Sequence, residues 1–265
     1  MPMQDTQRNF VKVAGLLPVA AAVFAGSAHA TVTNEGTAYR LDDGKAAYRE
    51  IHMVFESGGK PARLVLYRCV DGTAFARKIV VKREGALDPD FDFIDGRTGY
   101  REGVRTTDNG REVYWQASKG DAEKRKIVDA PANAVIDAGF DALVRTQWQQ
   151  LSSTNGIDAR FLLPSAMRFL KVRIQRIGGM PATGTTHLRM KLDSWCGFAA
   201  PDTNLDYQTA DRHLLRFKGI GNIRDRRGRT QAVRIEFPGG LQPHMTRAAE
   251  IDAARRMPLT GHCGD

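Results

Sequence analysis

The sequence has 265 residues, of which 42% are hydrophobic and 26% charged, and a formal net charge of +9. A chain of this length can bury a sizeable core without disulfide or metal staples, and one domain of this size is ordinary for an all-β protein. Its three cysteines include no C-x-x-C pair, which excludes a dithiol redox site and a zinc knuckle.

The first 30 residues have the pattern of a secretory signal. Arg8 and Lys12 precede the apolar run Val13–Gly26, and Ala28-His29-Ala30 follows it as an A-x-A cleavage site. The alternative is a membrane anchor, but the run is shorter than the roughly 20 residues that span a bilayer. We therefore expect cleavage after Ala30 and one β-rich domain, residues 31–265, that is periplasmic and not integral to the membrane.

Beyond this leader, apolar and polar residues alternate with a period of two, which predicts β-strands. Turn signals at Ser57–Pro61 and Asp108–Gly110 predict hairpins between strands. The alternation is clear at Ile51, Met53 and Phe55, and it returns in the runs 170–175, 188–193, 215–218 and 233–237. These runs predict a mainly β fold, a long antiparallel sheet with one apolar and one wet face.

One segment, Ala134–Leu151, has helical periodicity instead, with a single wide apolar arc. Asn133 is its expected N-cap. A weaker helix is expected near the C-terminus, from Arg247 to Arg255. The fold class we expect is thus a mainly β sheet with one amphipathic helix and a short C-terminal helix.

The stretch Phe217–Arg229, FKGIGNIRDRRGR, combines glycines and cations. It lacks the third glycine of a dinucleotide-binding loop and the Gly-Lys-Ser/Thr of a P-loop. Asp225 and Gly228 occupy the first and fourth positions of a type I turn, which favours a hairpin with a cationic tip. An anion contact at that tip, through Arg226 and Arg227, stays open.

No other motif names a reaction, a cofactor or a metal. Asp88–Gly96 resembles a calcium loop but has neither the glycine at its sixth position nor the acid at its twelfth. The histidines show no metal-binding spacing, and Ser194 has no neighbour that would activate it. A hydrolase assembled from distant residues stays possible in principle. We expect no metal and no cofactor.

On the later strands, cations alternate with apolar residues and therefore lie on the face away from the core. We expect this outer face to be basic. In an exported protein the available polyanions are lipid headgroups and lipopolysaccharide, and we expect no nucleic-acid partner. The alternative is a solvated face that prevents edge aggregation. The residues expected to contact an anionic surface are Arg173, Arg189, Lys191, Lys218, Arg226 and Arg227.

In an oxidising compartment two of the three cysteines are expected to pair. The tail cysteine, Cys263, is suited to a tether, and Cys196 follows a predicted strand. We expect a Cys196–Cys263 bond, with Cys69 a buried free thiol.

Three segments resemble an uncharacterised family of exported proteobacterial proteins. They are YREIHMVFESGGKPARLVLYRCVDGTAFARKIV (48–80), IDAGFDALVRTQWQQL (136–151) and LLRFKGIGNIRDRRGR with VRIEFP (214–238). The order of elements is also similar to the periplasmic lipoprotein carriers of the Lol type. That resemblance implies a curved sheet, a half-barrel or open barrel, with the helix across its concave face and a hydrophobic ligand inside.

Two functions therefore follow as hypotheses. The first is a non-catalytic carrier or sensor that binds a lipid or acyl chain between sheet and helix. The second is an envelope interaction module with a filled core and no ligand. A cavity would favour the first, and its expected lining is Met53, Phe55, Phe140, Leu143, Trp148, Leu151, Val172 and Met190.

Overall fold

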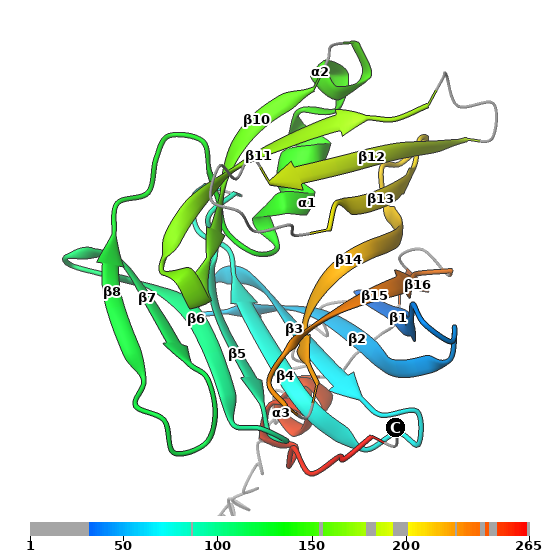
Figure 1. Ribbon diagram of the computed structural model, residues 1–265. Coiled ribbons are helices and arrows are strands. Elements are labelled where there is room, and N and C mark those ends of the chain that lie inside the picture. The colour runs from blue at the N-terminus through cyan, green and yellow to red at the C-terminus, as the bar shows by residue number, and fades with distance from the viewer. Residues whose placement is uncertain are drawn as a thin grey trace, which may run out of the picture.

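The computed structural model describes residues 32–85, 87–153, 156–178, 184–192, 201–225, 227–238, 242–243 and 248–263. Residues 1–30, which were predicted to be a signal, lie outside these ranges, as do Cys196 and Arg226. In the described residues sixteen strands form one sheet (Figure 1). They are β1 (Val32–Arg40), β2 (Ala46–Ser57), β3 (Lys60–Arg68), β4 (Ala74–Val81), β5 (Asp90–Asp95), β6 (Tyr100–Thr107), β7 (Gly110–Gln116), β8 (Lys124–Val128), β9 (Ala134–Val135), β10 (Ile157–Leu163), β11 (Arg168–Arg176), β12 (Thr185–Leu192), β13 (Thr203–Gln208), β14 (Leu214–Arg224), β15 (Thr230–Glu236) and β16 (Gln242–Pro243).

The sheet consists of two meanders joined edge to edge. Strands β1–β8 pair in chain order, strands β9–β15 do the same, and β1 pairs with β15 to join them. The pairs are antiparallel except β9 with β10, and β16 lies beside β1. This architecture confirms the predicted mainly β fold, an open sheet in which β8 and β9 are the ends of the described path.

The two ends of the sheet approach each other through loops. The 3₁₀ turn η1 (Pro164–Ala166), between β10 and β11, contacts β6 and β7. The backbone N–H of Ile136 donates a hydrogen bond of 2.9 Å to the carbonyl of Leu87, in the β4–β5 loop. Because β10–β11 and β5–β7 belong to different meanders, these contacts enclose an interior.

The predicted hairpin turns are confirmed. β2 and β3 join around Ser57–Lys60, and β6 and β7 around Thr107–Gly110. The stretch Phe217–Arg229 lies in the β14–β15 hairpin, where the N–H of Gly228 donates to the carbonyl of Asp225 at 2.9 Å. The register shifts between Ile220 and Arg224, as expected for a bulge at the Gly219–Gly221 segment.

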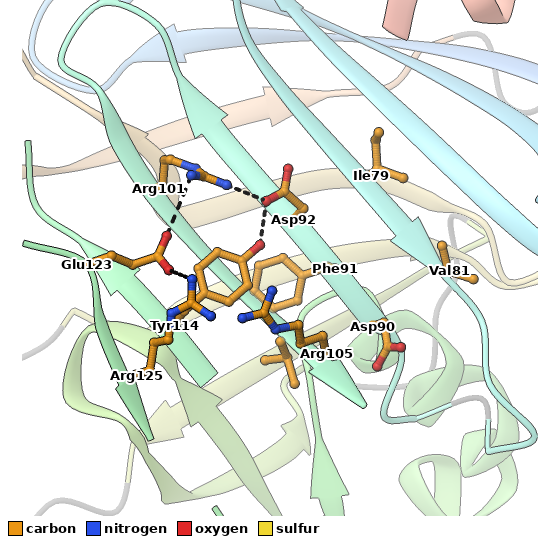
Figure 2. Close-up of a pocket in the computed structure, with 11 residues that line it drawn as sticks. Ile79, Val81, Asp90, Phe91, Asp92, Arg101, Arg105, Tyr114, Glu123 and Arg125 are labelled. Carbon is orange, nitrogen blue, oxygen red and sulfur yellow. Dashed lines mark hydrogen bonds and ion pairs between the residues drawn. The ribbon is translucent and has the colours of Figure 1, made fainter. Parts of the chain in front are cut away.

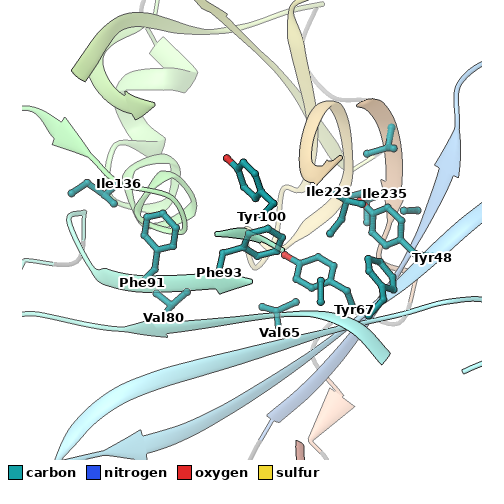
Figure 3. Close-up of a cluster of buried hydrophobic side chains, with 14 of the residues drawn as sticks. Tyr48, Val65, Tyr67, Val80, Phe91, Phe93, Tyr100, Ile136, Ile223 and Ile235 are labelled. Atoms are coloured by element: carbon teal, nitrogen blue, oxygen red, sulfur yellow. The ribbon is translucent and has the colours of Figure 1, made fainter. Parts of the chain in front are cut away.

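The main core lies on the inner side of the sheet and includes residues of both meanders. Tyr48, Tyr67, Phe93 and Tyr100 form a chain of rings with successive centroids 5.7–6.1 Å apart (Figure 3). All four side chains are at most 2% exposed. Aromatic pairs at this separation add to the stability gained from burial alone.

The predicted helix Ala134–Leu151 is wrong in its extent. Ala134 and Val135 form β9, which pairs in parallel with Arg160 and Phe161 of β10. The helical residues divide into α1 (Gly139–Thr146) and α2 (Trp148–Ser153), and Ala138, not Asn133, is the N-cap of α1. The periodicity of a short apolar run such as Ala-Val-Ile fits both a helix and a strand. Here the run forms a strand because it pairs with β10.

The predicted C-terminal helix is confirmed as α3 (Ala248–Arg256). It lies on the outer face of the sheet, far from α1 and α2 (Figure 1). Its residue Ala254 packs with Met53, Leu64 and Leu66, and the Arg255 guanidinium lies 4.4 Å from the centroid of the Phe55 ring. Met53 and Phe55 are therefore under α3 and do not line the interior, which corrects their predicted place.

The predicted Cys196–Cys263 bond is also wrong, because Cys69 and Cys263 form a disulfide. The chain after α3 runs beside the start of β4, where the N–H of Gly261 donates to the carbonyl of Ala74 at 2.8 Å. This contact brings Cys263 to the end of β3, where Cys69 lies. Sequence spacing does not show which strand the tail passes, so Cys69 was wrongly expected to be free.

Candidate ligand-binding site

The interior of the curved sheet contains a pocket of about 410 Å³. Residues from both meanders line it, and α1 contributes Phe140. Its volume lies in the range of about 300–1,000 Å³ that small-molecule sites occupy. The pocket is therefore large enough for a ligand, and it lies where the two meanders face each other.

One part of the pocket wall is apolar. Side chains from α1, β10, β12, β13, β14 and β15 contribute to it, and those that carry the argument are Phe140, Phe161, Met190, Leu205, Phe217 and Phe237. Leu205 and Phe237 are at most 6% exposed. A wall of this kind favours an aliphatic or aromatic group through the hydrophobic effect.

The other part is a polar row that crosses the first meander. Cross-strand pairing aligns Asn34, His52, Val65, Lys78, Phe93 and Glu102 on β1 to β6 in one register. Because residues in one register have side chains on the same face, this row points inward. We name its four polar members, Asn34, His52, Lys78 and Glu102, the polar row; all four line the pocket.

Two polar residues of the second meander, Asp137 and Asn222, contact the polar row. We name Lys78, Glu102, Asp137 and Asn222 together the floor of the pocket. The Lys78 ammonium donates to Asp137, between β9 and α1, at 2.7 Å, and to the Asn222 side chain on β14 at 3.1 Å. Asn222 in turn donates to Glu102 at 3.4 Å. These bonds link strands of both meanders across the interior.

Asp137 has a backbone φ of +43°, a conformation that few residues other than glycine adopt. Just after it, a Cβ at Gly139 would collide with the carbonyl of Leu87. The chain is therefore tightly constrained where it delivers the Asp137 carboxylate to Lys78. Strained backbone held by its surroundings is a feature of functional sites.

Two carboxyl groups in the floor, those of Asp137 and Glu102, have shifted pKa values. Burial acts to raise the pKa of Asp137, but the Lys78 ammonium outweighs it and holds the pKa below its ordinary 3.8. Burial raises the pKa of Glu102, against an opposing hydrogen bond of 2.6 Å from the Tyr100 hydroxyl. The Asp137 carboxylate is thus ionised at neutral pH, and Glu102 is easier to protonate than an exposed glutamate.

His52 predicts a pH dependence of stability. Burial lowers its pKa below the ordinary 6.5, although the Glu50 carboxylate at 3.1 Å opposes the shift. Below about pH 6.5 the unfolded chain binds a proton that the folded chain refuses, so stability is lost as the pH falls. We expect the urea midpoint to fall less between about pH 7.5 and pH 5.5 in His52→Gln than in the wild type. Equal falls in the two proteins would contradict this assignment.

The structure separates the predicted lining residues into three groups. Phe140 and Met190 line the pocket. Leu143, Trp148, Leu151 and Val172 are buried in a second core, where α1 and α2 pack on β10–β13. Met53 and Phe55 lie on the outer face under α3. The polar row was missed because its members are far apart in sequence, and alternation on a strand does not show which face turns inward.

The predicted basic outer face is present in the described residues. Arg173 lies directly opposite Lys191, Lys218 lies opposite Arg234, and Arg189 shares the face. Acids accompany these cations, since Arg173 contacts Asp158 at 2.9 Å and Asp202 lies 3.7–3.8 Å from Arg189 and Lys191. Arg227 is exposed at the β14–β15 turn. Whether this face contacts an anionic surface stays a prediction.

A second pocket, of about 340 Å³, opens on the outer face of β4–β7 (Figure 2). Its charged groups form ion pairs with one another or with neighbouring residues. Arg101 bridges Asp92 and Glu123, at 3.5 and 3.6 Å, and Arg125 binds Glu123 at 2.6 Å. The Tyr114 hydroxyl donates to Asp92. Because these charges neutralise each other, we place the candidate site in the interior pocket.

The fold and the pocket define a mainly β protein with an open, barrel-like sheet around a mixed apolar and polar cavity. Within the described residues, no helix combines the length and apolarity needed to cross a bilayer.

No protein-family profile matches the sequence, and no curated protein matches it. Among solved structures, the chain is similar to the beta-barrel-like protein of domain of unknown function DUF1849 from Brucella abortus. The TM-score is 0.44 and the identity 10%, over 78% of this chain and 94% of that chain.

Proposed function

We propose that the protein is a non-catalytic carrier or sensor that binds one acyl-chain ligand in the interior pocket. The observation that carries this proposal is the pocket itself, about 410 Å³ between the inner face of the sheet and α1. An envelope module with a filled core would pack this space with its own side chains. The pocket volume is near the lower end of the usual range, which favours one chain over a two-chain lipid.

The two-sided lining supports an amphipathic ligand. The apolar wall offers burial to a hydrocarbon chain, while the polar row and Asp137 offer charged and hydrogen-bonding groups to a headgroup. Buried polar groups are costly unless they are hydrogen-bonded, so a ligand with a polar end satisfies this lining better than a pure hydrocarbon. The lining is thus more polar than the sequence predicted.

We also propose that the protein acts in the periplasm. The leader 1–30 supports export through its signal-peptide pattern. The Cys69–Cys263 disulfide supports it independently, because cytosolic thiols are generally kept reduced.

A substitution at Phe140 tests whether this side chain contacts the ligand or only fills the core. It is only partly buried and lines the pocket. We expect Phe140→Ala to cost less than the about 3–5 kcal/mol of a fully buried phenylalanine, and to weaken acyl-chain binding. Leu143→Ala is the matched control on the same helix, because Leu143 is 7% exposed and packs in the second core.

Urea unfolding and calorimetric titration with dodecanoate measure these two effects separately. The control is expected to lose about 2–5 kcal/mol of stability and to keep its affinity while folded. A full core penalty at Phe140 with unchanged affinity would contradict the proposed site.

The direct test is gentle purification of the mature protein, followed by solvent extraction and mass spectrometry. We expect a single-chain lipid at a ratio approaching one per protein. No bound lipid, together with no heat on titration with any acyl ligand, would favour the second candidate, an envelope interaction module. The cross-strand cation pairs on the outer face, such as Arg173 with Lys191, are the observation that supports that candidate.

A further inference from the structure

Arg63 is a pocket-lining cation without a direct partner among the described residues. It lies on β3, two residues from Val65 and four from Tyr67, and all three side chains line the pocket. No described carboxylate forms an ion pair or hydrogen bond with its guanidinium. Its side chain is half-buried, so water screens it less than it screens a surface arginine.

The other charged side chains that line the pocket do have partners. Lys78 binds Asp137 at 2.7 Å, and Arg145 binds Asp141 at 2.9 Å. Further contacts are Glu50 to His52 at 3.1 Å, Glu102 to the Tyr100 hydroxyl at 2.6 Å, Arg224 to the same hydroxyl at 2.9 Å and His213 to Asp211 at 2.5 Å. Since Asp137 is already held by Lys78, the charge on Arg63 is not neutralised by direct contact.

Asn34, two strands from Arg63, also lines the pocket with a polar atom that has no partner. Cross-strand pairing places Asn34 opposite His52 on the neighbouring strand, and Arg63 lies on the next strand, opposite Val54. The side-chain oxygen of Asn34 is buried and makes no hydrogen bond. This oxygen is an acceptor, so it can receive a hydrogen bond from water or from a protonated ligand group, and the contact with a carboxylate rests on Arg63 alone.

We propose that the pocket selects acyl ligands with a carboxylate headgroup, and that Arg63 binds this carboxylate. This inference rests on the proposed function and adds the headgroup. A guanidinium offers two parallel N–H donors that match the two carboxylate oxygens. A cationic headgroup meets a like charge at Arg63, and an uncharged one leaves the guanidinium without an anion. The carboxylate is therefore the headgroup that this end of the pocket favours.

The experiment compares three ligands of equal chain length by isothermal titration calorimetry: dodecanoate, dodecanol and dodecylamine. The wild type is expected to bind dodecanoate most tightly. Arg63→Gln should weaken dodecanoate about 10–100-fold, the effect of losing a charge-assisted hydrogen bond, and change dodecanol by less than about threefold. Arg63→Lys should recover part of the loss, because it keeps the charge without the paired donors.

Arg168→Gln is the matched control, since Arg168 is exposed on β11 and does not line the pocket. It should leave the three affinities unchanged. Equal wild-type affinities for dodecanoate and dodecanol would overturn the headgroup assignment while leaving the proposed function standing. This comparison uses only the wild type, so it does not depend on whether a variant folds. Binding of none of the three ligands would overturn the proposed function itself.

Discussion

Replacing Lys78 by methionine is expected to lower the free energy of unfolding by about 3–5 kcal/mol. The side chains of Lys78 and Asp137 are 9% and 10% exposed, and their charged atoms lie 2.7 Å apart. Methionine fills similar space but leaves the Asp137 carboxylate buried without its counter-ion. Lys78 is also the donor to Asn222, so the variant removes a bond that joins the two meanders. Urea unfolding of both proteins measures the difference.

The double variant Lys78→Met/Asp137→Asn is the control. It removes both charges and keeps, at position 137, a residue that tolerates positive φ. Replacing a whole buried ion pair is often close to neutral, so we expect most of the lost stability to return. A loss below about 1 kcal/mol in the single variant would show that the pair is exposed to water in solution.

Removing the disulfide, by Cys69→Ser with Cys263→Ser, is expected to cost about 3–5 kcal/mol. The bond joins residues 194 positions apart, so it strongly restricts the unfolded chain. It also holds the chain that follows α3 against β4, where Gly261 bonds to Ala74. The same loss is expected when the wild type is unfolded in a reducing agent.

Cys196→Ser is the matched control for this prediction. The disulfide uses two of the three cysteines, so we expect this variant to keep the full stability of the wild type. Non-reducing peptide mapping should yield one linked pair, the peptides that carry Cys69 and Cys263. A link to Cys196 would contradict the structure and restore the pairing that the sequence suggested.

The strands were predictable from sequence, but the face that each strand turns inward was not. On β2, the alternation correctly places Ile51, Met53 and Phe55 on one face and Glu50 and His52 on the other. We expected the apolar set to face the ligand. In the structure α3 covers that set, and the polar set faces the pocket. A period of two shows that a strand has two faces, while a distant helix decides which face is outside.

The candidate site was only partly predictable for a similar reason. Phe140 and Met190 lie in strongly apolar patterns, and both line the pocket. The floor combines Lys78, Glu102, Asp137 and Asn222, each of which has an ordinary local sequence. Only cross-strand register and the packing of one meander on the other bring them together. No local motif contains that information.

A methyl NMR titration of residues 31–265 with dodecanoate tests the central claim most directly. We expect shifts confined to methyl groups that line the interior pocket, such as those of Val65, Met190 and Leu205. Methyl groups of Met53 and Leu66, which pack under α3 on the other side of the sheet, should stay unchanged. Shifts centred under α3, or no shifts up to the solubility of the ligand, would contradict an acyl-chain site inside the sheet.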